Sequence, residues 1–570
     1  MNDIRRSILW VVFGFSMVLI WDKWQIHNGK APTFFPSAAV TAPAATSAAA
    51  PAADASVPAA SAAPSAIAPA GAGAASVAPD AGAPAPAAVR HEASTDVFKL
   101  TFNSEGGSLI GATLLKHASK QLGSEPFQLL TQNDQHTYIA QTGLIGGSFP
   151  THKTPMTLVP GPTSLADGQD TLVVKFESAD VGGVKLVKTY TLKRGSYTID
   201  VAHEVVNTGT TPVTPQLYVQ LVRDGNKTES ETPFYSTFTG PAVYTSAQKY
   251  QKIEFSQIND NKADFQKTST DGYVAMVQHY FTSAWMLPDG TARENFARRI
   301  DNNLFSVGTI TSLPAIAPGQ SQTIDARLFV GPQLEKVLEV TAPGLELVKD
   351  YGWLTIIAKP LYWLLEKIHS YVGNWGWAIV LLVVLLKAAF YWLNASAYRS
   401  MAKMKAINPR IMEMRERLKN NPQLMQQEMM KIYREEKVNP LGGCFPILIQ
   451  IPVFIALHWV LLSSVEMRNA PWIGWITDLS TLDPFYVLPA IMTVTTVVQT
   501  ALNPLPPDPL QAKMMWLMPL MFSVMFFFFP AGLVLYWITN NILTIAQQAF
   551  INHKMGVPLK ITNPFELFKK

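Results

Sequence analysis

The sequence predicts a multi-pass α-helical membrane protein that also carries a large all-β domain. Three observations support this fold class. Of the 570 residues, 48% are hydrophobic but only 15% are charged, against about 25% in soluble proteins. Long apolar runs gather after residue 350. Residues 95–340 instead alternate apolar and polar side chains, which is typical of β-strands with one buried face.

Composition also excludes several kinds of site. The net charge of +4 is too small for a dedicated nucleic-acid binder, so we expect no direct sequence-specific nucleic-acid binding. The single cysteine, Cys444, excludes an intramolecular disulfide framework and a cysteine-rich zinc site. We expect neither a metal nor a cofactor.

Residues 1–24 contain an uncharged apolar run, Ser7–Trp21, directly after two arginines. Such a run is either a cleaved secretory signal or a retained membrane anchor. The anchor is favoured because Trp21 and Trp24 follow in place of a cleavage site, and tryptophan prefers the membrane interface.

Residues 25–94 are expected to form a disordered tether. Nearly two-thirds of residues 31–90 are Ala or Pro, and almost none is charged. Such a composition buries too little apolar surface to offset the conformational entropy lost on folding. The ten prolines of this stretch also prevent a continuous alanine-rich helix.

Residues 95–340 are predicted to form a large β-sandwich. Val184–Val206 alternates apolar and polar residues around Arg194-Gly195, which suits a hairpin turn. Further short strands are expected at Asp170–Phe176, Tyr273–Val277 and Arg327–Val330. Many short strands punctuated by Gly, Pro and Asn are typical of a sandwich.

The apolar half begins with an amphipathic helix at 351–370, whose tryptophans suit a position in the membrane surface. A five-helix core, residues 375–550, follows. Its spanning candidates are 375–396, 443–464, 485–502, 514–529 and 531–550. Because a span needs about 20 apolar residues, the shorter candidates are expected to begin or end in protein-lined or wet surroundings.

Lysines and arginines in the short loops predict the orientation, because they favour the cytoplasmic side. The loop 398–437 holds ten of them, the loop 465–484 holds only Arg468, and the basic tail 551–570 holds four. This distribution predicts six spans, counting the anchor, with both termini in the cytoplasm. The β domain then faces the periplasm, and the expected location is the bacterial inner membrane.

Polar side chains are costly inside spans, so their positions indicate function. Four spans place polar residues at similar depth in their cytoplasmic halves. These residues are Lys387, Tyr391, Asn394, Gln450, Thr496, Gln499, Asn503, Asn540, Thr544 and Gln547. They predict a hydrophilic cavity that opens to the cytoplasm. The alternatives are that Lys387 extends to the membrane surface and that the other residues hydrogen-bond between packed helices.

The loop 398–437 is predicted to be a cytoplasmic helical hairpin. Apolar residues recur every three or four positions in both halves, and Asn421-Pro422 suits the start of the second helix. Its surface methionines include Met404, Met414, Met425 and Met429. These flexible thioethers either form a surface for varied apolar partners or only hold the hairpin together.

Three segments resemble a known family, namely Lys437–Pro446 (KVNPLGGCFP), Asp483–Pro489 (DPFYVLP) and Phe529–Tyr536 (FPAGLVLY). They are similar to the YidC/Oxa/Alb family of membrane protein insertases, and the resemblance covers residues 350–555 closely. The anchor and the large β domain match the Gram-negative type of this family.

The resemblance implies an insertase without a chemical reaction, which helps newly made inner-membrane proteins enter and fold in the bilayer. It also implies a hydrophilic groove in the inner leaflet with one positive side chain, usually arginine, at the position of Lys387. Substrate contacts of the family would fall near Val383, Tyr536 and Trp537. The implied partners are nascent membrane proteins, the Sec translocon, the ribosome (through cytoplasmic loops) and membrane lipid.

Two other functions compete with this interpretation. A secondary transporter would show inverted repeats and a midplane site, but the sequence has neither clear repeats nor a carboxylate inside a span. A membrane-anchored sugar enzyme is suggested because the family's periplasmic domain resembles sugar mutarotases, although fold does not convey function. His203 and His279 lie in apolar strand patterns, where we expect core histidines.

Overall fold

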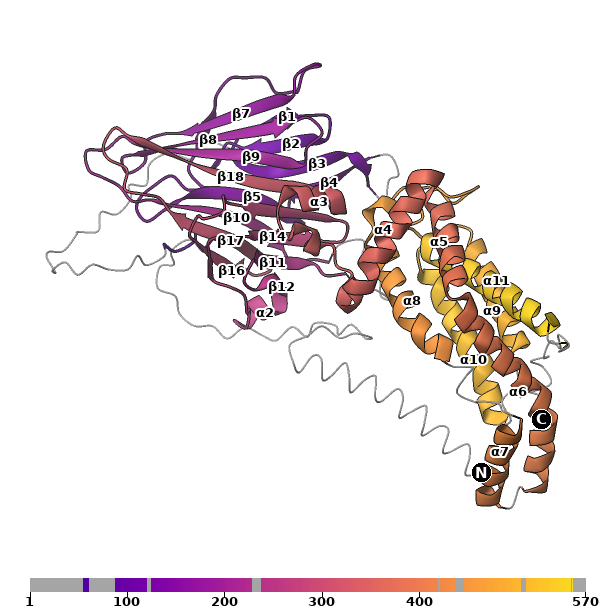
Figure 1. Ribbon diagram of the computed structural model, residues 1–570. Coiled ribbons are helices and arrows are strands. Elements are labelled where there is room, and N and C mark those ends of the chain that lie inside the picture. Colours follow the sequence, from indigo (N-terminus) through magenta and orange to yellow (C-terminus); the bar gives the residue numbers. More distant parts are fainter. Residues whose placement is uncertain are drawn as a thin grey trace. The chain divides into compact units, whose positions relative to one another are not determined.

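The structure is a computed structural model that describes residues 55–60, 88–119, 125–227, 237–418, 421–436, 445–503, 509–554 and 556. The predicted anchor 1–24, most of the tether and most of the basic tail lie outside these residues. The chain divides into two compact units, a β domain within 37–349 and a helical unit within 350–570 (Figure 1).

The β domain is a sandwich, as predicted, and its described residues form two nine-stranded sheets with antiparallel pairing. The first sheet has the order β1 (Arg90–Ser94), β2 (Phe98–Asn103), β3 (Ser108–Ala118), β4 (Pro126–Gln132), β5 (Thr137–Ile145), β10 (Gln216–Asp224), β17 (Leu304–Ser312), β16 (Arg293–Asp301) and β13 (Thr268–Ser269). The second has the order β12 (Lys249–Lys252), β11 (Gly240–Thr245), β14 (Tyr273–Gln278), β15 (Phe281–Met286), β18 (Ser321–Pro332), β9 (Thr198–Asn207), β8 (Val184–Lys193), β7 (Thr171–Ser178) and β6 (Met156–Leu158).

The hairpin predicted from Val184–Val206 is confirmed. Strands β8 and β9 pair in register, with Leu192 opposite Ile199. Gly195 in the turn has a φ of +70°, a conformation that glycine adopts without steric cost. The three other predicted strands are also present as β7, β14 and part of β18.

Two of the hydrogen bonds that cross the sandwich come from the aromatic residues Trp285 and Tyr138. The indole of Trp285 on β15 donates to the carbonyl of Gln220 on β10 at 3.1 Å. The hydroxyl of Tyr138 on β5 donates to the carbonyl of Met276 on β14 at 3.0 Å. Both side chains are almost completely buried, and buried polar groups of this kind require such partners. Short helices α2 (Phe255–Asn259), α3 (Glu335–Thr341) and η1 (Leu345–Val348) complete the domain.

The helical unit has helices in each of the segments expected to be helical, although the one over 375–396 is bent. Its helices are η2 (Gly352–Leu354), α4 (Thr355–Val372), α5 (Trp375–Ala389), α6 (Tyr391–Arg417), α7 (Pro422–Glu435), α8 (Phe445–Ser463), η3 (Val465–Met467), α9 (Val487–Leu502), α10 (Pro509–Met525), η4 (Phe526–Phe528) and α11 (Ala531–Lys554). Helix α11 packs against α9 and α5, and α4 packs against α8 and α5.

Two of the motifs that suggested the family begin helices. The carboxylate of Asp483 accepts hydrogen bonds from the backbone N–H groups of Phe485 and Leu488, at 3.0 and 2.7 Å, where α9 starts. Pro530 directly precedes α11. The first N–H groups of a helix have no partner within it, and proline suits this position because it has no N–H. The third motif, Lys437–Pro446, lies mostly outside the described residues.

The continuous helix predicted over 375–396 is wrong. The chain leaves the helical conformation at Phe390, and α5 meets the first part of α6 at an angle of 65°. Beyond this bend α6 runs without interruption to Arg417, so the end of the predicted span and the first arm of the predicted hairpin form one helix.

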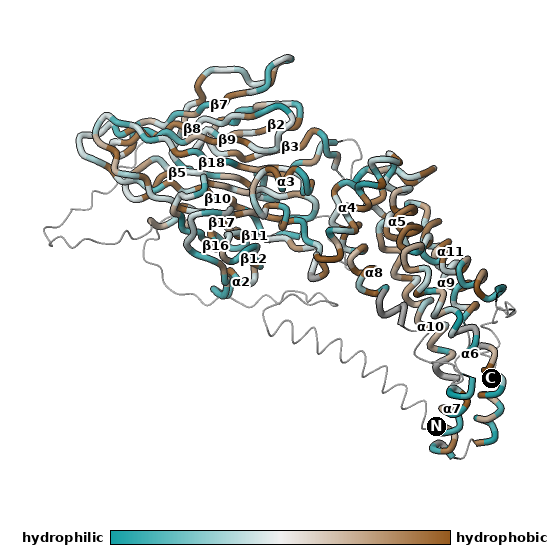
Figure 2. The backbone as a smooth tube through the Cα atoms, viewed as in Figure 1, coloured by the Kyte–Doolittle hydropathy of each residue, from teal (hydrophilic) through white to brown (hydrophobic). Residues whose placement is uncertain are grey.

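Hydrophobic residues dominate α5, α8 and α10, whereas α7 is largely hydrophilic (Figure 2). By length and hydropathy, no single helix within the described ranges could cross a membrane. The bent pair formed by α5 and the Tyr391–Ser400 part of α6 passes that test together.

One short part of the predicted tether departs from the expectation of disorder. Residues 55–60 are placed against the first sheet of the β domain and hydrogen-bond to it. The physical reason is that strands β10 and β16 offer fixed donors to this segment, a contact that local composition does not reveal.

Candidate functional site

Lys387 lies in the last turn of α5 and points to α11. Its Nζ donates a hydrogen bond to the hydroxyl of Thr544 at 2.8 Å. That hydroxyl in turn donates to the carbonyl of Asn540 one turn earlier in α11, at 2.7 Å. Lys387 is half-buried and Thr544 is buried. Among the described residues, no carboxylate contacts the side chain of Lys387.

Two further contacts join the helices whose polar residues were predicted to share a depth with Lys387. The amide of Gln450 on α8 donates to the side-chain oxygen of Asn394 on α6 at 3.2 Å. The amide of Gln547 on α11 donates to the backbone carbonyl of Tyr391 at 3.4 Å. We call Lys387, Tyr391, Asn394, Gln450, Thr544 and Gln547 the polar cluster. Its hydrogen bonds join α5 to α11, α8 to α6, and α11 to α6.

Helix α9 and the residue that follows it also bond to α11, through two of the predicted residues. The hydroxyl of Thr496 accepts from the amide of Asn541 at 3.0 Å, and the side-chain oxygen of Asn503 accepts from the amide of Gln548 at 3.2 Å. These are hydrogen bonds between packed helices, which was the alternative explanation for that stripe. Gln499 is half-buried.

Asn541 and Gln548 were missed by the sequence analysis, although each is more than nine-tenths buried. A signal for them exists, because α11 contains two doubled amides, Asn540-Asn541 and Gln547-Gln548, seven residues apart. Adjacent residues on a helix point about 100° apart, so the two side chains of each doublet point in different directions from α11. Only the first member of each doublet, Asn540 or Gln547, was predicted from the sequence.

The three positions expected to contact substrate are mostly covered by the protein itself. Val383 and Tyr536 are buried. Trp537 is half-buried and packs edge-on against Phe454 at a centroid distance of 4.5 Å. The large apolar side chains that α5 exposes are instead Trp377, Leu381, Val384 and Leu385.

In the region of the predicted hairpin, helices α6 and α7 pack against each other. Asn421 accepts a hydrogen bond from the backbone N–H of Leu424, with Pro422 at the first helical position, as predicted. Ile407, Ile411, Met414 and Ile432 form its core. The partly buried residues packed against this core include Met404, Met425 and Met429. All four singled-out methionines therefore hold the two helices together.

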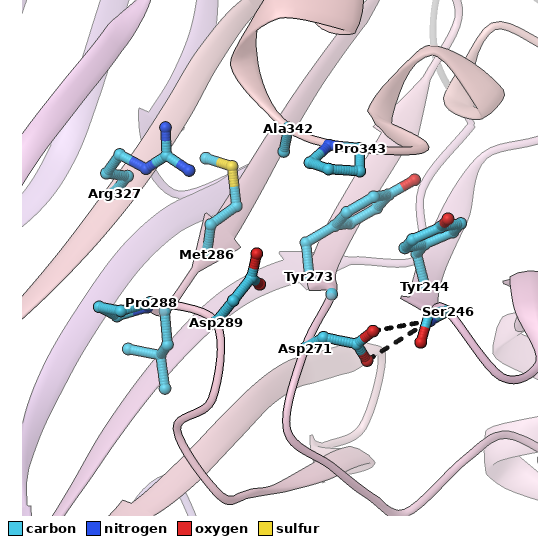
Figure 3. A pocket seen from close by; sticks show the side chains of 12 residues that line it. Tyr244, Ser246, Asp271, Tyr273, Met286, Pro288, Asp289, Arg327, Ala342 and Pro343 are labelled. Carbon is cyan, nitrogen blue, oxygen red and sulfur yellow. Dashed lines mark hydrogen bonds between the residues drawn. The ribbon is translucent and has the colours of Figure 1, made fainter.

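The β domain contains a pocket of about 110 Å³ (Figure 3). The rings of Tyr244 and Tyr273 stack at 5.2 Å along one wall, and Asp271 accepts from the backbone N–H of Ser246 at 3.2 Å. Neither His203 nor His279 lines this pocket. His203 is fully buried against Thr142, as expected for a core histidine.

Apolar helices that enclose a polar cluster, joined in one chain to a β-sandwich, define a membrane protein with a domain outside the membrane. Residues 90–364 match the YidC periplasmic domain, and residues 367–557 match the 60Kd inner membrane protein. The chain therefore belongs to the YidC family of membrane protein insertases, as the three motifs indicated.

The relatives support this assignment over the whole chain. A membrane protein insertase YidC of Burkholderia multivorans is 56% identical over 561 residues, which cover 97% of this chain and 99% of the relative. The family is a bacterial inner-membrane protein with a periplasmic domain, and the β-sandwich is that domain.

Two solved structures show weaker likeness. An active YidC insertase with its first transmembrane domain resolved is 20% identical, with a TM-score of 0.37, covering 80% of this chain and 93% of that chain. A galactose mutarotase related enzyme from Lactobacillus acidophilus is 8% identical, with a TM-score of 0.28, covering 42% of this chain and 97% of that chain. At these scores neither likeness bears on function.

Proposed function

We propose that the helical unit binds a polar segment of a newly made membrane protein at the polar cluster, next to Lys387, and that the neighbouring apolar segment then enters lipid. The contact between Lys387 and Thr544 carries this proposal, because it holds a cation among apolar helices where no described residue offers a carboxylate. Such a residue inside a membrane protein is a functional site by default.

The energetic reason is the cost of moving polar groups through hydrocarbon. A charged side chain at the bilayer centre costs about 3 kcal/mol or more. Amide and hydroxyl groups at the cluster replace part of the lost hydration, and Lys387 adds attraction for an acidic segment. Burial of the apolar segment in lipid, at about 25 cal/mol per Å², then drives insertion without a chemical reaction.

The proposed topology has six spans, counting the anchor, with both termini and the hairpin in the cytoplasm. The ten basic residues of 398–437, against one in 465–484, support it. In this orientation the polar cluster lies in the inner leaflet. We further propose that the ribosome docks on the basic hairpin, that lipid faces the exposed side chains of α5, and that the Sec translocon is a partner.

Replacing Lys387 tests the function directly. With a single-span substrate that carries an acidic tail, Lys387→Ala should insert at least about tenfold more slowly, since a hydrogen bond to a charged group contributes about 1.5–3 kcal/mol. Lys387→Arg should retain insertion, because it keeps the charge. The measurement is protease protection of the tail in proteoliposomes.

Lys367→Ala is the matched control, because this exposed lysine on α4 lies outside the cluster. It should insert at the unmodified rate. Photo-cross-linkers at Gln499 and Asn540 provide a second readout, and we expect stalled substrate to react with both. Undiminished insertion by Lys387→Ala would remove the lysine from the mechanism.

A further inference from the structure

A segment of the tether occupies a built site on the β domain. Residues 55–60, with the sequence ASVPAA, lie on the first sheet. Tyr218 and Gln220 line this face, and they alternate along β10 with the core residues Leu217, Val219 and Leu221. Because side chains alternate between the faces of a strand, the site lies on the face of the first sheet that points away from the second sheet.

The main chain of the segment is held by two side chains from neighbouring strands. Arg298 on β16 donates from Nη2 to the carbonyl of Ser56 at 3.1 Å and from Nη1 to the carbonyl of Val57 at 3.2 Å. Gln220 on β10 donates to the same Ser56 carbonyl at 3.1 Å. A planar guanidinium that spans two consecutive carbonyls selects for one backbone geometry.

Gln220 is fixed in the orientation that this contact needs. Its side-chain oxygen accepts from the hydroxyl of Ser306 at 3.0 Å, so its amide nitrogen is left to donate. That nitrogen also donates to Gln141 at 3.0 Å. Gln220 and Ser306 are fully buried. The donor is therefore positioned by the sheet before any peptide binds.

The side chains of the segment are recognised as well. Val57 packs against the cluster formed by Ile145, Tyr218 and Ile310, together with Phe296. The hydroxyl of Ser56 lies 3.3 Å from Nε2 of His152, which is itself buried. The site therefore contacts the segment through both apolar and polar side chains.

Proline is suited to the third position of the segment Ser56-Val57-Pro58. Pro58 is buried, and it has no N–H that would need a partner there. Proline also favours an extended conformation in the residue before it, which here is Val57. Val57-Pro58 is the one Val-Pro pair between residues 31 and 90, so this register is specified by the sequence.

We propose that this face of the β domain is a peptide-binding site for extended Ser-Val-Pro segments, and that residues 56–58 of the same chain are its resident ligand. Docking fixes residues 56–58 of the predicted tether to the β domain. Only residues 25–54 then remain to span the distance from the predicted anchor to the β domain.

The test uses the full-length protein in nanodiscs, with residues 55–60 replaced by a Gly-Ser sequence of equal length. A fluorescent peptide with the sequence of residues 51–64 should bind this variant saturably in an anisotropy titration. Binding to the unaltered protein should be at least about tenfold weaker, because the tethered segment competes at an effective concentration in the millimolar range.

Arg298→Ala in the Gly-Ser variant should abolish binding, whereas Arg299→Ala should not, since Arg299 is exposed and points to Asn259. A peptide with Val57→Asp should fail to bind without any change in the protein, which separates recognition from misfolding. A peptide of residues 70–83, in which Ala78 separates Val77 from Pro79, should bind more weakly. Absence of saturable binding, or equal binding by the Val57→Asp peptide, would overturn the proposal.

Discussion

Lys188 is a fully buried lysine in the sandwich, and its contacts determine its protonation state. Its Nζ donates to the carbonyls of Gly106 and Thr142 at 2.6 and 2.7 Å. A neutral amine has two N–H donors, which matches these two acceptors. Burial lowers the pKa of Lys188 to about 7. Its cross-strand partner His203 is equally buried, and burial, with Lys188 adding to it, lowers the pKa of His203 to about 3.

This lysine predicts a pH-dependent stability of the β domain. Its pKa is about 7 in the folded protein and 10.5 when unperturbed. Between these values the unfolded chain binds more protons, so stability rises with pH by up to about 1.4 kcal/mol per unit. Residues 37–349 should therefore gain roughly 2 kcal/mol between pH 7 and 9 relative to Lys188→Met. Urea unfolding monitored by the buried Trp285 measures this, and parallel pH profiles would contradict it.

The residues of the polar cluster show how far single positions can be predicted. Lys387 and Thr544 were found because charge and polar spacing are visible in an apolar run. Asn541 and Gln548 were missed because both members of each doublet lie at the same depth. Which member faces α9 depends on the rotation of α11 about its axis, and packing against its neighbours sets that rotation.

At the scale of elements, the bend between α5 and α6 is the main departure from expectation. Residues 375–396 contain no proline, and the apolar run continues through Phe390, so the usual signs of a kink are missing. Other helices hold the residues after the bend in place through hydrogen bonds. Asn394 accepts one from Gln450 on α8, and the carbonyl of Tyr391 accepts one from Gln547 on α11. These contacts join residues more than 50 positions apart, which local patterns do not encode.

The hairpin permits a prediction at this scale. Ile411 is almost fully buried in the core between α6 and α7, whereas its neighbour Met412 is exposed. Ile411→Ala should destabilise the hairpin by about 2–5 kcal/mol, as for other buried isoleucines. Met412→Ala should change stability by less than about 0.5 kcal/mol. Hydrogen exchange of the α7 amides distinguishes the two, and equal protection in both variants would show that the pair does not pack.

At the scale of the molecule, the chain consists of two compact units with separate cores. We predict that deletion of residues 88–349 leaves the helical unit folded and retains most of the insertion activity, because the polar cluster lies entirely within 350–570. The measurement is the same protease-protection assay used for Lys387. Complete loss of insertion by a folded helical unit would instead place an essential function in the β domain, as the sugar-enzyme alternative requires.

The sequence by itself determined the class of protein, the division into a β region and an apolar helical region, and the family. These properties depend on local composition and on side-chain periods of 2 and 3.6, which each segment carries within itself. The tertiary structure alone decided which polar residues meet, where α5 ends, and that Ser56 and Val57 hydrogen-bond to β10 and β16. Such contacts join residues distant along the chain, and they depend on helix rotation, bends and sheet register, which are settled only when the elements pack together.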